Sequence, residues 1–196
     1  MKILLVNGSV RKEHTTHTLL EKARKGFEEQ ECETELIHLI DTQFPHKYVY
    51  DEDNEPTRHP TPEVRAILDK MVAADGIVFG TPTYWMSRSS LMQSLLEHLT
   101  VEEYNPPKIQ YPLYGKVAGI IVTGTQGGNT GVAAQLAVAL SHFGFLIPPF
   151  GICWHSPHMK HTQENWNEHV PALIVQEMLQ ALHTYNTHGQ HTQPQK

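Results

Sequence analysis

Apolar and polar positions alternate in blocks along this chain. Short apolar runs suited to buried parallel strands are separated by stretches with the period of amphipathic helices. The predicted strands are Lys2–Val6, Glu35–Leu39, Gly76–Gly80, Val117–Thr123 and Phe145–Ile152. The predicted helices are Thr15–Glu29, Thr61–Ala74, Ser89–Thr100, Thr130–Phe143 and Asn165–Tyr185. This alternation predicts an α/β protein with one open, five-stranded parallel sheet and helices on both of its faces.

The length of 196 residues favours one domain over two. We expect this domain to span residues 1–185, with a flexible tail rich in Gln, Thr and His over 186–196. Two stretches with prolines and aromatic residues, 41–62 and 101–114, predict long surface loops, because neither has a regular apolar period. The first is expected to cover a partner subunit or the mouth of a site.

Composition excludes several classes of partner. The net charge of -6 argues against a general nucleic-acid surface, and no apolar stretch is long enough to predict a membrane span. The two cysteines, Cys32 and Cys153, lie far apart and form no CxxC pair, so a thiolate metal site is not predicted. Together with a strand that begins at Lys2 without a basic, apolar leader, this pattern predicts a cytoplasmic protein.

The turn after the first strand has the chemistry of a phosphate site. Gly8 permits a sharp turn, Ser9, Thr15 and Thr16 carry hydroxyl groups, and the following helix presents free backbone N–H groups. Arg11 adds a planar cation that suits a terminal phosphate monoester better than a bridging pyrophosphate. The sequence has neither G-x-G-x-x-G after this strand nor a Walker loop, which favours a mononucleotide. The alternative is a plain helix cap formed by Ser9 or Thr15.

Two further loops are expected to meet the first, because ligands of open parallel sheets bind beyond the carboxyl ends of the strands. After the third predicted strand, Pro82 is expected to end the strand, and Tyr84, Trp85 and Met86 form an exposed turn suited to a flat ring system. Alternatively, Tyr84 and Trp85 pack under the next helix.

The loop after the fourth predicted strand, 123–131, is rich in glycine and has no basic residue. Its backbone N–H groups therefore suit the partial charge of a ring carbonyl better than a phosphate. A turn in which Asn129 or Thr130 caps the next helix is the structural alternative.

These three loops together resemble the NADPH-dependent FMN reductase and NAD(P)H:quinone reductase branch of the flavodoxin-like flavoproteins, over roughly the first 150 residues. The resemblance implies strand order 2-1-3-4-5 and a homodimer or homotetramer. It also implies that the FMN phosphate is held by Ser9, Arg11, Thr15 and Thr16. The ribityl chain and isoalloxazine would be bordered by Pro82, Thr83, Tyr84, Trp85 and Met86. The pyrimidine edge would be covered by Thr123, Gly124, Thr125, Gly127 and Gly128.

The implied activity is transfer of reducing equivalents from NAD(P)H through bound FMN to a quinone, a free flavin or a similar small-molecule acceptor. The alternative is a flavodoxin-type single-electron carrier without NAD(P)H turnover. Members of this branch with an iron–sulfur cluster carry a cysteine cluster after the second strand, and residues 41–62 contain no cysteine. Glu13 lies beside the phosphate loop and would weaken phosphate binding unless it points to solvent.

No catalytic residue is assigned from the sequence. Flavin chemistry needs few side chains, and fixed backbone donors at Gly127 and Gly128 are candidates for stabilising the charge near the flavin N1 and C2 carbonyl. His155, His158 and His161 could supply a proton or, with the histidines further along, bind a metal. A native metal site is not predicted, because no carboxylate or cysteine stands at ligand spacing.

Overall fold

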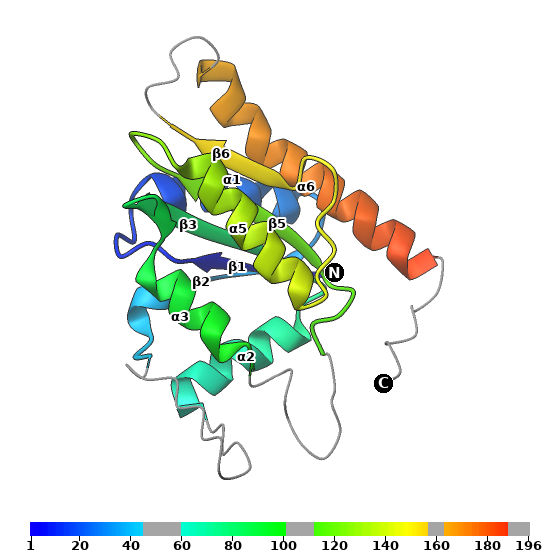
Figure 1. The fold of residues 1–196 in the computed structure, drawn as a ribbon. Coiled ribbons are helices and arrows are strands. Elements are labelled where there is room, and N and C mark those ends of the chain that lie inside the picture. Colours follow the sequence, from blue (N-terminus) through cyan, green and yellow to red (C-terminus); the bar gives the residue numbers. More distant parts are fainter. Residues whose placement is uncertain (45–59, 101–111, 157–162, 188–196) are drawn as a thin grey trace.

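The computed structural model describes residues 1–44, 60–100, 112–156 and 163–187, with the side chains of 163–168 and 185–187 left aside. Its centre is a sheet in the order β2-β1-β3-β5-β6, and a short β4 pairs with β3 (Figure 1). The strands are β1 (Lys2–Asn7), β2 (Glu33–His38), β3 (Gly76–Tyr84), β4 (Ser87–Arg88), β5 (Val117–Thr123) and β6 (Ile152–His155). All neighbours are parallel except β3 and β4. The predicted fold and strand order are confirmed once the two-residue β4 is set aside.

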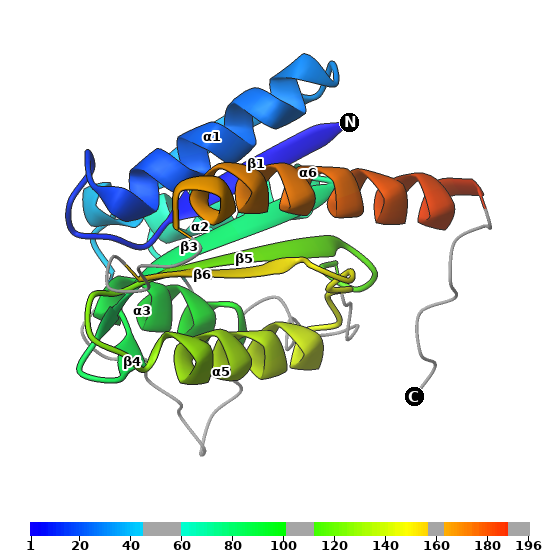
Figure 2. The same cartoon turned by 90° about the horizontal axis from the view of Figure 1, so that it is seen from above.

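Helices cover both faces of the sheet (Figure 2). The helices are α1 (Thr15–Glu29), α2 (Pro62–Ala73), α3 (Ser90–His98), α5 (Asn129–His142) and α6 (Gln163–Thr187), with a short 3-10 helix η1 (Leu39–Asp41) after β2. Successive side chains of β1 point to opposite faces of the sheet, so Leu4 and Val6 join the core under α2, α3 and α5. Ile3 and Leu5 join a second core under α1 and α6. The sheet is thus buried on both faces, as parallel sheets require.

Two sequence predictions near the sheet were wrong. Residues 145–151 form only an isolated bridge, Val117 to Leu146, and the regular strand begins at Ile152. Pro148 and Pro149 lack the N–H groups that a ladder needs, and Phe150 has a φ of 52°. Pro82 does not end β3, because it stands opposite Thr123 in the parallel ladder and the strand continues to Tyr84. The missing N–H is tolerated near the end of the ladder.

Other predictions fall on residues of which nothing is described. Most of the expected loops 41–62 and 101–114, the histidines His158 and His161, and the end of the tail lie outside the described residues. The single domain over 1–185 therefore stays a prediction. Among the described residues, no helix is both long and apolar enough to cross a membrane.

Candidate functional site

The loop between β1 and α1 is shaped by hydrogen bonds from its own backbone. The Ser9 N–H donates to Asn7 Oδ1 at 2.9 Å, and the Arg11 N–H donates to Ser9 Oγ at 3.1 Å. Gly8 approaches β3 closely, since its N–H donates to the Gly80 carbonyl at 2.7 Å. A side chain at this point would press on that carbonyl and on Met92. The start of the loop therefore lies directly against the middle of β3 before α1 begins.

The first turn of α1 offers unpaired donors at the end of this loop. Its N-cap is His14, whose side chain makes no capping bond, so the alternative of a cap formed by Ser9 or Thr15 is wrong. Within the described residues, the N–H groups of Thr15, Thr16 and His17 have no hydrogen-bond partner. Such a terminus carries a partial positive charge and binds anions.

Arg11 is a cation in the same loop, shortly before these donors in sequence. Its side chain is exposed, and Nη1 lies 3.4 Å from His14 Nε2. Among the described residues Arg11 has no carboxylate partner, whereas the neighbouring Lys12 pairs with Asp41 at 2.6 Å. Glu13 is also exposed. A cation without a local counter-ion thus stands beside an uncapped helix start.

The turn between β3 and β4 holds two bulky residues in the left-handed region. Trp85 and Met86 have φ values of 48° and 61°, and the flanking pairs Tyr84–Ser87 and Thr83–Arg88 form an antiparallel ladder. This is the two-residue hairpin geometry that normally selects Asn and Gly. Trp85 is fully exposed at 101%, Met86 at 66% and Tyr84 at 41%, so the alternative that Tyr84 and Trp85 pack under the next helix is wrong. Strain that displays apolar side chains is typical of a ligand site.

The loop between β5 and α5 brings glycine backbone against this hairpin. Gly127 and Gly128 have φ values of 141° and 79°. A Cβ built on Gly128 would lie 2.6 Å from Met86 Sδ, while one on Gly127 would meet nothing within 4 Å. The α5 N-cap is Gly128, without a side-chain bond, so neither Asn129 nor Thr130 caps this helix. The Asn129 amide instead donates to the carbonyls of Gly124 and His155.

Direct contacts join the three loops. Ser89, just after β4, donates from Oγ to the Gly8 carbonyl at 2.7 Å. Thr16 and Thr123 share a buried hydroxyl–hydroxyl bond of 2.7 Å, which ties the start of α1 to the end of β5. With Met86 against Gly128, these contacts place all three predicted loops at the carboxyl edge of the sheet.

The predicted site residues lie in different environments along this edge. Thr16, Thr123 and Pro82 are buried, and the two threonine hydroxyls are each other's partners. The hydroxyl of Thr83 is buried and has no hydrogen-bond partner within the described residues. The predicted site residues that are exposed or partly exposed are Arg11, Thr15, Tyr84, Trp85, Met86, Gly124, Thr125, Gly127 and Gly128. Ser9 is buried, with its hydroxyl held by the Arg11 N–H.

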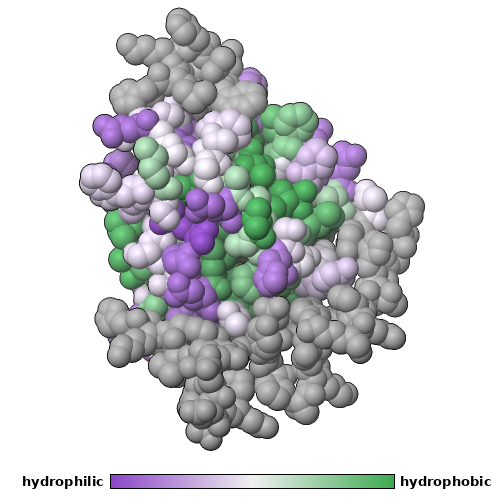
Figure 3. Space-filling model, in the orientation of Figure 1, coloured by the Kyte–Doolittle hydropathy of each residue, from purple (hydrophilic) through white to green (hydrophobic). Residues whose placement is uncertain are grey.

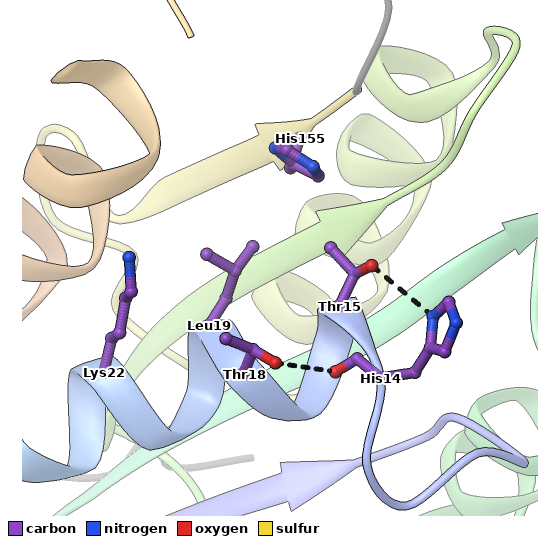
Figure 4. A pocket seen from close by; sticks show the side chains of 6 residues that line it. All are labelled: His14, Thr15, Thr18, Leu19, Lys22 and His155. Carbon is purple, nitrogen blue, oxygen red and sulfur yellow. Dashed lines mark hydrogen bonds between the residues drawn. The ribbon is translucent and has the colours of Figure 1, made fainter. Parts of the chain in front are cut away.

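Sequence reasoning missed a cavity of about 300 Å³ that runs along α1 beside this edge (Figure 4). The residues that line it are His14, Thr15, Thr18, Leu19, Lys22 and His155. The α1 members recur on one helix face, a pattern that the sequence contains. Only the structure brings His155, at the end of β6, opposite them.

Two further polar residues are Arg88, which the sequence did not single out, and Asn129, which the sequence offered only as a helix cap. Arg88 donates from Nε to Gln93 at 2.6 Å, but its Nη1 is buried without a partner in the described part of the chain. Burial lowers the pKa of Arg88 below its ordinary value. Asn129 Oδ1 is likewise buried and unpaired there. These atoms flank the hairpin and the glycine loop.

The cysteines have no part in the site. Cys32 and Cys153 are free and buried in the core under α1 and α6. Burial raises the pKa of the Cys153 thiol to about 12, so this thiol stays protonated and unreactive. The described residues contain no cluster of His, Cys, Asp and Glu that could hold a metal ion.

An open parallel sheet with three loops converging at its carboxyl edge defines a flavodoxin-like protein. The chain belongs to the NADPH-dependent FMN reductase family, whose model matches residues 1–156. The family description, an FMN reductase that depends on NADPH, agrees with FMN as cofactor and NAD(P)H as reductant, which the resemblance implied.

Named relatives and a solved structure are similar to this chain. An 8-demethyl-8-aminoriboflavin-5'-phosphate synthase of Streptomyces davaonensis is 31% identical over 157 residues, which are 76% of this chain and 61% of the relative. The chain thus spans less than two thirds of that protein. An iron–sulfur flavoprotein of Methanocaldococcus jannaschii is 31% identical over 150 residues, covering 75% of this chain and 72% of the relative. The crystal structure of RosB with a bound 8-demethyl-8-formylriboflavin-5'-phosphate has a TM-score of 0.81 and 24% identity, covering 95% of this chain and 81% of that one.

Proposed function

We propose that this protein passes reducing equivalents from NAD(P)H through bound FMN to a quinone, a free flavin or a similar small acceptor. The supporting observation is that an uncapped helix start, a strained aromatic hairpin and an open glycine loop are tied together at one edge of the sheet. An electron acceptor of this kind needs an exposed site, and the exposed Trp85 and Met86 provide an open apolar border.

The residues present fit FMN. Unpaired N–H groups at the start of α1, with Arg11 beside them, match a dianionic phosphate. The buried, unpartnered hydroxyl of Thr83 lies next to the hairpin and requires a polar partner. Gly127 leaves space that a side chain would fill. In this proposal Ser9, Arg11 and Thr15 hold the phosphate end, while Thr16 and Thr123 position the two loops.

The remaining roles follow from the same arrangement. Bound FMN supplies a ring that accepts and releases hydride. The hairpin residues Tyr84, Trp85 and Met86 border that ring and limit water on one side. The backbone N–H groups of Gly127 and Gly128 donate toward the pyrimidine edge, where fixed dipoles stabilise negative charge. We propose a reducing, cytoplasmic setting for this activity.

The first test is the visible spectrum of the purified protein with added FMN, followed by anaerobic addition of NADPH. We expect a yellow complex that bleaches, steady NADPH oxidation once a quinone is added, and FMN recovered unchanged. Bleaching without turnover would favour the single-electron carrier. A protein that stays colourless when soaked in FMN would contradict the proposal.

The second test is the Arg11→Ala variant. Loss of a charge-assisted bond to phosphate is worth about 1.5–3 kcal/mol, so FMN should dissociate roughly 10- to 100-fold more readily, with an unchanged unfolding midpoint. The matched control is Arg65→Ala on α2, an arginine that pairs with Asp69 at 2.8 Å. Equal FMN retention in both variants would place the phosphate elsewhere, for example at residues 123–130.

A further inference from the structure

Asn7 and His38 form a contact beneath the loop that we propose for the FMN phosphate. They are the last residues of β1 and β2 and stand opposite each other in the parallel register. Asn7 is completely buried. Its amide nitrogen lies 3.1 Å from His38 Nδ1, and its amide oxygen accepts the Ser9 N–H at 2.9 Å.

The direction of each hydrogen bond in this group is fixed by elementary chemistry. A backbone N–H can only donate, so the atom of Asn7 that faces Ser9 is the oxygen. The NH2 group of Asn7 then faces His38 and can only donate as well. His38 Nδ1 must therefore carry a lone pair, and the ring must be neutral with its proton on Nε2.

The same chain of bonds continues into the loop. The Ser9 hydroxyl accepts the Arg11 N–H at 3.1 Å, so His38, Asn7, Ser9 and Arg11 are linked in series. If His38 Nδ1 gains a proton, two donors face each other. Either the Asn7 amide turns, which takes the acceptor away from Ser9, or the contact opens. Both outcomes loosen the part of the loop that carries Arg11.

The surroundings of His38 favour its neutral form. The His17 ring on α1 lies 5.3 Å from the His38 ring, centroid to centroid, and His17 Nδ1 is buried without a partner in the described residues. The pKa of His38 is lowered first by burial and then by the nearby His17 and Lys12. Asp41 on η1 and Glu21 on α1 oppose this shift.

We propose that His38 is a positioning residue that acts through Asn7 to hold Ser9 and Arg11 in the anion-binding arrangement, and that protonation of His38 Nδ1 releases them. This inference rests on the proposed FMN site and adds a proton-dependent control of its affinity. FMN should bind tightly while His38 is neutral and more weakly as the pH falls through the pKa of His38. The sign follows because only the neutral ring accepts the Asn7 bond.

The test compares His38→Asn with the wild-type protein. The Asn oxygen takes a place close to that of Nδ1 and accepts the same bond, but it does not titrate. His142→Asn, at the exposed end of α5, is the matched control. FMN dissociation constants are measured by equilibrium dialysis from about pH 8 to about pH 5.5.

Every variant should lose some affinity in this range, because the phosphate itself takes up a proton near pH 6. We expect the wild-type protein and His142→Asn to lose roughly tenfold more than His38→Asn, the effect of one hydrogen bond. Coincident pH curves for all three proteins, with FMN bound, would overturn the inference and leave the proposed function intact.

A second measurement needs neither FMN nor a variant. Nitrogen-15 NMR of the ligand-free protein should show the His38 proton on Nε2 at neutral pH, and the Ser9 and Arg11 amide signals should titrate together with the ring. The inference would be overturned by a His38 proton on Nδ1 at neutral pH. It would also be overturned if the Ser9 and Arg11 amide signals did not change as the His38 ring titrates. If the titration is seen but FMN never binds, the proposed function fails instead.

Discussion

Gly128 and Gly131 lie three residues apart and differ in what a methyl group would do. Gly128 has a φ of 79° and touches Met86, whereas a Cβ on Gly131, in the first turn of α5, would meet nothing within 4 Å. Gly128→Ala should lower the free energy of unfolding by about 1–3 kcal/mol and weaken FMN binding. Gly131→Ala should raise it by about 0.4–1 kcal/mol, since alanine restricts the unfolded chain and favours helix. Urea unfolding measures both, and equal midpoints would show that the backbone strain at Gly128 is absent.

At the residue scale, the chemistry of the site could be proposed from sequence but its contacts could not. Arg11, Trp85 and the glycines stand out by type and order. The bond between Asn7 and His38 depends on the register of β1 against β2. The apolar pattern of the two strands does not determine this register. The pairing of Thr16 with Thr123 likewise depends on where α1 crosses the sheet.

At the scale of the element, the backbone strain of the hairpin between β3 and β4 lowers the stability of the protein but exposes the side chains of the turn. Replacing Trp85 with Asn and Met86 with Gly supplies the residues that this turn favours and should stabilise the protein by about 1–2 kcal/mol. The same change should weaken FMN binding, because the apolar border is lost.

Glu31, with a φ of 57° in the turn between α1 and β2, is the matched control. Glu31→Gly should leave FMN binding unchanged, and unfolding and dialysis experiments on both variants measure the two effects. Unaltered FMN affinity in the hairpin variant would remove the hairpin from the site.

The type of each element, helix or strand, could be predicted from the apolar period. The predicted limits of the strands were wrong where prolines affected the backbone. The start of α1 at Thr15 was predicted correctly. The edge strand was misplaced because Phe145–Ile152 is apolar in sequence while Pro148 and Pro149 cannot join a ladder. At Pro82 the error was the opposite one. The proline was expected to end the strand, but it lies within the last residues of β3.

For the whole molecule, α6 is a structural necessity although the family match ends at residue 156. The helix supplies much of the core that lies against α1, namely Val170, Ile174, Val175, Met178 and Leu182. Gly119 on β5 lets this helix approach the sheet, since a Cβ there would lie 2.7 Å from Met178 Sδ. A chain ending at residue 156 should lose roughly 8–15 kcal/mol of burial at about 1.5–3 kcal/mol for each side chain, as much as a whole domain's stability. We expect no cooperative thermal transition by circular dichroism, and a sharp transition would contradict this.

The surface of the molecule also shows where subunits could meet. Apolar surface gathers over α5, the chain after it and β6 (Figure 3). Val138, Leu146 and Phe150 are exposed there, and α5 carries no Asp, Glu, Lys or Arg. A contiguous exposed apolar patch often marks a surface that a partner covers. The homodimer or homotetramer stays a prediction that this face supports.

The full exposure of Trp85 has a practical consequence. An indole surrounded by water emits at long wavelength, and Trp154 is less exposed, at 37%. A flavin arriving beside the hairpin would extinguish this red-shifted emission. Trp85 would thus be an intrinsic optical reporter at the edge of the proposed site, and its emission would follow FMN occupancy in real time without a label.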